Sequence, residues 1–91
     1  MVVDEIFRVC SNPHLARAVL ASIGGTFAIS FASEASRNNN SPGAHAALIV
    51  KAFADAATYD DRADVWRAAR GSRQPITSGL RYILSQAMSL S

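Results

Sequence analysis

The sequence has few of the residues that cross-link or anchor small proteins. It holds a single cysteine, Cys10, among 91 residues, which excludes a disulfide within the chain. Residues 1–5 carry acidic side chains where a secretory signal peptide carries basic ones, and no apolar run approaches the ~18–20 residues that cross a bilayer. We therefore expect a cytoplasmic protein without a membrane segment, in a compartment that keeps thiols reduced.

The spacings that mark common catalytic sites are also missing. No serine stands in a Gly-x-Ser-x-Gly or Ser-x-x-Lys arrangement. The pair Gly24-Gly25 lacks both the third glycine of a dinucleotide-binding turn and the lysine of a phosphate loop. Cys10 follows an apolar helical pattern, where a thiol behaves as a small buried hydrophobic group. We expect no enzymatic activity and no cofactor, and no motif of a known family is recognisable.

Metal ligands are equally scarce. His14 and His45 have no further nitrogen, sulfur or carboxylate ligand at a zinc spacing. Asp60, Asp61 and Asp64 form an acidic cluster, but they lack the alternating oxygen ligands and the glycine of a calcium loop. Acidic residues at the start of a helix are favourable by themselves, because they complement the helix dipole. We expect no metal site.

Acidic side chains are absent from the C-terminal part of the sequence. The formal net charge is only +2, which is weak for a nucleic-acid-binding protein. No aspartate or glutamate follows Asp64, whereas the charged residues beyond it are all arginines: Arg67, Arg70, Arg73 and Arg81. One end of the molecule is therefore predicted to be basic.

What the sequence does contain is alanine and serine in abundance, on a chain long enough for a single domain over residues 1–91. Alanine favours helices because it loses no side-chain entropy in them. It also buries little apolar area, so the core is expected to be shallow. Such a domain often gains burial from another chain, and we expect a homodimer or a stable complex with a partner.

Apolar residues recur at spacings of three and four along most of the chain, which is typical of amphipathic helices. Asn12-Pro13 and Ser41-Pro42 each combine a capping residue with a proline suited to the first helical position. The predicted fold is all-α, a compact bundle of about five short helices. The helical segments are 2–10, 13–23, 44–58, 62–70 and 77–89, with Asp60 and Asp61 as caps of the fourth and Thr77 or Ser78 at the start of the fifth.

Residues 26–37 fit two patterns. Phe27, Ile29 and Phe31 alternate with small residues, as in a strand over 26–32, while Phe27 and Phe31 are also four apart, as in a helix. We favour the helix. A strand here would have no mate in the chain and would have to pair with another protomer. Phe27 and Phe31 are the residues we expect at a self-association surface.

The segment from Arg62 to Arg81 carries the one candidate binding surface. On a helix, Arg62, Trp66 and Arg70 lie close to one stripe, followed by Arg73. Guanidinium groups beside an indole permit stacking and cation–π contacts, and tryptophan and arginine are enriched among interface hot spots. Trp66 is either a core anchor with arginines around its edge or an exposed hot spot. We favour the core position for Trp66.

Two functions of different kinds follow from these observations. The first is a small non-enzymatic regulator, adaptor or inhibitor that binds another protein with an acidic surface. The residues expected to contact this partner are Arg62, Trp66, Arg67, Arg70, Arg73 and Arg81.

The alternative is a DNA-binding regulator with a helix-turn-helix-like unit at residues 62–89. Its second helix would present Thr77, Ser78, Arg81 and Ser85 to the major groove. The expected turn from Gly71 to Ile76 is longer than the usual three to four residues, and base-reading side chains are few. We therefore favour the protein-binding function.

Overall fold

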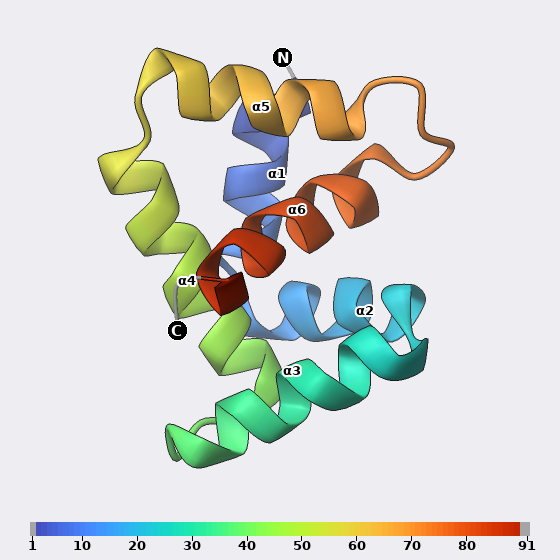
Figure 1. The fold of residues 1–91 in the computed structure, drawn as a ribbon, viewed down its shortest axis with the longest axis vertical. Coiled ribbons are helices and arrows are strands. Elements are labelled where there is room, and N and C mark those ends of the chain that lie inside the picture. Colours follow the sequence, from blue (N-terminus) through green and yellow to red (C-terminus); the bar gives the residue numbers. More distant parts are fainter. Residues whose placement is uncertain (1, 90–91) are drawn as a thin grey trace.

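Six helices succeed one another in the computed structural model, which describes residues 2–89 (Figure 1). They are α1 (Val2–Cys10), α2 (Pro13–Ile23), α3 (Gly25–Arg37), α4 (Pro42–Ala56), α5 (Tyr59–Ala69) and α6 (Pro75–Ser89). No strand occurs within these residues, so the predicted all-α bundle is confirmed. The segment that also fitted a strand is helix α3, and with it the bundle has six helices rather than about five.

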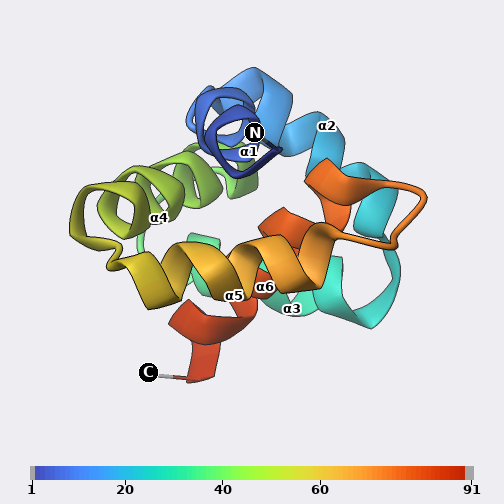
Figure 2. The ribbon, with the colours of Figure 1, turned by 90° about the horizontal axis from the view of Figure 1, so that it is seen from above.

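Helix α6 occupies the centre of the molecule and packs against α1, α2, α4 and α5. In Figure 1, α5 lies at one end of the long axis and α3 at the other. Figure 2 shows α5 passing over α6 when the molecule is seen from above. The backbone of α3 approaches α2 and α4. No helix in the described part of the chain is long and apolar enough to cross a bilayer.

The starts of α2 and α4 follow the capping pattern of the sequence. The Asn12 side-chain oxygen accepts a hydrogen bond from the backbone N–H of His14 at 2.9 Å, and Ser41 caps α4 in the same way through the third residue after it. Pro13 and Pro42 are the first residues of the two helices. The backbone N–H at the first position of a helix has no carbonyl partner within the helix. A proline there, which has no N–H, therefore removes no helical hydrogen bond.

The start of α5 differs from the expectation. Thr58, rather than Asp60 or Asp61, is the capping residue. Its hydroxyl accepts the backbone N–H of Asp61 at 3.1 Å, and the Asp61 carboxylate accepts the backbone N–H of Thr58 at 3.0 Å. This reciprocal pair satisfies two backbone donors at once, and it moves the helix start forward to Tyr59.

Helix α6 also starts earlier than expected, at Pro75 instead of Thr77 or Ser78. A proline at the first helical position is preorganised for the helix. The connection from α5 is therefore residues 70–74, which is shorter than the expected turn. A hydrogen bond of 2.7 Å between the hydroxyl groups of Ser72 and Ser78 joins this connection to the first turn of α6.

The core is apolar throughout the described residues, which bury no polar or charged side chain. All six helices contribute to it. Its members are Val3, Ile6, Phe7, Cys10, Ala16, Leu20, Phe31, Ala46, Val50, Val65, Ala69, Leu80, Ile83 and Leu84. Phe31 is the largest of the side chains that are completely buried. Because several core positions are alanine, each helix gains stability mainly from a few large neighbours.

The buried thiol of Cys10 gives the stability a defined pH dependence. Burial raises its pKa from 9.0 to about 11, so the folded protein holds the neutral thiol where the unfolded chain already ionises. The stabilisation is complete below pH 9 and is lost as the pH rises toward 11. At about 1.4 kcal/mol per pH unit, we expect the free energy of unfolding to fall by up to about 2.7 kcal/mol across this window.

Urea unfolding followed by circular dichroism at several pH values measures this slope. We expect Cys10→Ala to be less stable at neutral pH and to lack the part of the slope that begins near pH 9. A smaller slope above pH 10 should remain in both proteins, because burial and the nearby Asp64 carboxylate raise the pKa of Tyr82 above its usual value of 10.0. Equal slopes from pH 9 in the two proteins would contradict the assignment to Cys10.

Candidate functional site

The outer face of α5 carries exposed aromatic side chains. Tyr59 is 85% exposed and Trp66 is 38% exposed, and both lie on one side of the helix with Arg62 and Ala63 between them. These four residues line a hollow of about 400 Å³. We call this surface, with Arg70 one turn beyond Trp66, the aromatic face. It brings together Arg62, Trp66 and Arg70 of the sequence-predicted binding residues.

The exposure of Trp66 corrects the favoured prediction that it anchors the core. Val65 and Ala69 are the residues of α5 that face the interior, and both are completely buried. Because these side chains are small, α5 can lie close to α6, against which it packs. The indole lies beside this interior side and stays partly exposed, at 38%.

Arg62, which belongs to the aromatic face, is restrained by two contacts within the protein. Its guanidinium group forms an ion pair with Asp4 of α1 and lies 5.1 Å from the centre of the Phe7 ring. Its side chain is 35% exposed. The two contacts restrict the rotamers of a long side chain before any partner arrives, which lowers the entropy lost on binding.

The remaining predicted arginines fall into two groups. Arg67 pairs with Asp64 one turn earlier on α5, and Arg81 lies 5.3 Å from the centre of the Phe27 ring of α3. Arg81 is therefore bound on another side of the molecule and does not belong to the aromatic face. Arg70 and Arg73 are exposed and form no ion pair within residues 2–89. They are the charges most available to an acidic partner.

The predicted self-association residues are not on a common surface. Phe31 is completely buried, and its ring centre lies 5.4 Å from that of His45 of α4. Phe27 is partly buried and is covered by the Arg81 guanidinium. The expectation that Phe31 is available to a second protomer was therefore wrong, because helices α2 and α4 cover that side of α3.

The position of α6 argues against the helix-turn-helix alternative. A recognition helix needs one free side to enter a DNA groove. Here α6 packs against four other helices, and three of its four candidate base-reading residues have partners within the protein. Ser78 is bonded to Ser72, Arg81 covers Phe27, and Ser85 donates its hydroxyl to the carbonyl of Arg81 at 2.7 Å.

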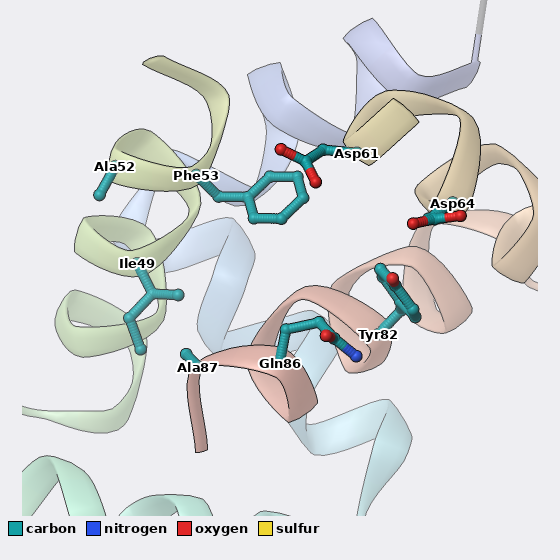
Figure 3. A pocket seen from close by; sticks show the side chains of 8 residues that line it. All are labelled: Ile49, Ala52, Phe53, Asp61, Asp64, Tyr82, Gln86 and Ala87. Carbon is teal, nitrogen blue, oxygen red and sulfur yellow. The ribbon is translucent and has the colours of Figure 1, made fainter. Parts of the chain in front are cut away.

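A larger hollow, of about 520 Å³, opens between α4, α5 and α6 (Figure 3). Its walls are mainly apolar, and two carboxylates stand at the α5 side. The lining residues are Ile49, Ala52, Phe53, Asp61, Asp64, Tyr82, Gln86 and Ala87. Burial, together with the nearby carboxylates of Asp64 and Asp61, raises the pKa of Tyr82. The sequence pattern did not reveal this hollow.

The two histidines lie in different places. His14 is exposed at the start of α2, whereas His45 contacts Phe31 and lies with its Nδ1 atom 3.3 Å from the side-chain amide of Asn40. Among residues 2–89, no three His, Cys, Asp or Glu side chains are arranged to hold a metal ion. The histidines are thus part of local structure at two helix starts.

Comparison with protein-family models, with curated proteins and with solved structures finds no significant match to this chain.

Proposed function

We propose that the protein is a small non-enzymatic regulator, adaptor or inhibitor that binds another protein through the aromatic face of α5. The observation that supports this most strongly is the exposure of Trp66 beside a fixed Arg62. Tryptophan, tyrosine and arginine together are the residues that most often dominate binding energy at protein interfaces. An aromatic side chain brings a large apolar area at low entropic cost, because it has only two rotatable bonds.

The partner surface is proposed to be acidic. Arg70 and Arg73 have no ion-pair partner within the described residues. Arg70 is the last residue of the aromatic face, and Arg73 follows it on the connection to α6. Such charges at the edge of an interface speed association and favour partners of opposite sign. Asp4 balances part of the charge of Arg62. The main contribution of Arg62 to binding is therefore a restrained side chain next to the indole, which a partner can pack against.

A homodimer and a cytoplasmic location remain predictions of the sequence. Because Phe31 is buried, it cannot form the predicted contact between two copies. A homodimer would have to use other, exposed apolar residues. Those with the largest exposed fractions on α3 and α4 are Ile29 at 72% and Leu48 at 56%.

Site-specific photo-crosslinking in the native host tests the proposal. A benzophenone side chain at position 59 lies on the aromatic face, whereas the same group at position 29 lies on α3 at the far end of the molecule. We expect a crosslinked protein adduct from position 59 and none of the same mass from position 29. Trp66→Ala should weaken the purified complex by at least about 30-fold, as for an interface hot spot.

The charge contribution is tested separately. Exchanging Arg70 and Arg73 for glutamate should slow association and remove most of its salt dependence, with little change in the circular dichroism spectrum. Arg17→Glu, an exposed arginine on α2, is the matched control and should leave binding unchanged. Absence of any adduct from position 59 would contradict the proposal. An adduct that nuclease removes would favour the DNA-binding alternative instead.

A further inference from the structure

The hollow between α4, α5 and α6 continues toward α3. A smaller hollow beside it is lined by Phe31, Glu34, His45 and Met88, and it shares Ile49 and Ala87 with the larger one. Together they form a trough along α4 and α6, which we call the α4–α6 groove. Figure 3 shows Ile49, Ala52 and Phe53 on the α4 wall and Tyr82, Gln86 and Ala87 on the α6 wall.

One end of the α4–α6 groove is negatively charged. Four of the seven acidic residues form ion pairs within the described chain. The three without one are Asp55, Asp60 and Asp61, which all lie where α4 passes into α5. Asp61 lines the groove, and within residues 2–89 its carboxylate accepts one hydrogen bond, from the backbone N–H of Thr58. Asp64 stands beside it, shared between Arg67 and Tyr82.

We propose that the α4–α6 groove binds one amphipathic helix of a second protein. Apolar side chains on one face of that helix fill the space between Ile49, Phe53 and Ala87, and a lysine or arginine at its end pairs with Asp61. An apolar trough between two helices is the usual receptor for such a segment, which is read through anchors three and four residues apart. The carboxylates at one end fix its direction, because only one orientation brings its cation to Asp61.

The arginine-rich connection of a second copy would fit the groove poorly. Arg70 and Arg73, two of the cations without an ion pair in the described residues, lie on Arg70-Gly71-Ser72-Arg73, which has no apolar side chain to fill the trough. The aromatic face and the groove also differ in sign, since arginines border the first and carboxylates the second. The protein would thus hold two different partners, which is the property of an adaptor.

Titration of ¹⁵N-labelled protein with two synthetic peptides tests the groove directly. Each peptide is an amphipathic helix of about 16 residues with leucines along one face. One carries two lysines at its end and the other two glutamates. We expect the lysine peptide to shift the amide signals of Ile49, Phe53 and Ala87, with a dissociation constant at least about tenfold lower than that of the glutamate peptide.

Two pairs of variants locate the contacts. Asp61→Asn keeps an oxygen for the Thr58 N–H and should weaken binding of the lysine peptide about fivefold. Asp60 lies in the same turn but outside the groove, so Asp60→Asn should change the affinity for this peptide less than about twofold. Ile49→Ala should weaken both peptides about tenfold, since it removes part of the apolar wall. Leu48→Ala, the neighbouring exposed residue, is its control.

Several results would overturn the proposal. The first is equal affinity for the two peptides. The second is a set of amide-signal shifts centred on Trp66 instead of the groove. The third is no amide-signal shift at about 1 mM peptide, the concentration at which even a weak specific interaction is detected. A further contradicting result would come from the protein without peptide. If light scattering shows a dimer, and the amide signals of the groove residues shift on dilution, the occupant of the groove is a second copy.

Discussion

Exchange of Phe31 for aspartate is expected to leave the chain unfolded at room temperature. The Phe31 ring is completely buried, so truncation alone removes about 3–5 kcal/mol. The new carboxylate would then stand in an apolar core without a partner, at a further cost of several kcal/mol. A small domain is stable by only about 5–15 kcal/mol in total, and the alanine-rich core places this one toward the lower end.

Far-ultraviolet circular dichroism and light scattering check this result. Ile29→Asp is the matched control, because it introduces the same charge on the same helix at a position that is 72% exposed. Its free energy of unfolding should stay within about 0.5 kcal/mol of the parent value. A Phe31→Asp variant that is folded, and monomeric where the parent is dimeric, would instead place the ring at an interface between protomers.

The same residue shows what the sequence pattern predicted and what it did not. The spacing of four between Phe27 and Phe31 correctly favoured a helix over a strand. It could not show which of the two rings is buried, because both lie on one side of α3. That depends on how α2 and α4 pack against α3, which the spacing of residues within α3 does not show. The prediction of a surface position for Phe31 therefore failed although its helix was correct.

Helix α5 gives a second case. The pattern placed Arg62, Trp66 and Arg70 on one stripe, as the structure shows. It favoured a buried Trp66, because the largest apolar residue of a short helix usually faces the core. The interior side instead belongs to Val65 and Ala69, which are small enough to let α5 lie against α6. The exposure of Trp66 follows from this packing distance, which sequence periodicity does not contain.

The α4–α6 groove left no recognisable signal in the sequence. Its lining residues come from four helices, α3, α4, α5 and α6, and each has a sufficient local explanation when read alone. Asp61 suits a helix start, and Ile49 and Phe53 suit an inward helix face. Only the arrangement of the helices leaves Phe53 and Asp61 side by side around an open space (Figure 3). Sites of this kind depend on tertiary structure, and a single sequence does not display them.

Gly43→Leu should be the most damaging substitution on α4, although leucine favours helix more than glycine does. Gly43 is buried where α4 meets α2, the pair of helices in most extensive contact. A Cβ atom at this position would lie 2.9 Å from the Arg17 Cβ and closer still to the Pro13 carbonyl oxygen. These are backbone or near-backbone atoms that no rotamer change removes, so we expect a loss of about 3 kcal/mol or more.

Ala44→Leu is the control for this prediction. Ala44 is the next residue of α4 and lines a hollow of about 420 Å³ between the starts of α2 and α4, so the added side chain has room. Urea unfolding should show a change within about 1 kcal/mol for Ala44→Leu. Because α4 also carries Ile49 and Phe53, Gly43→Leu should weaken the lysine peptide in the groove, whereas Ala44→Leu should not. Equal losses of stability in the two variants would contradict the close approach of α2 and α4 at Gly43.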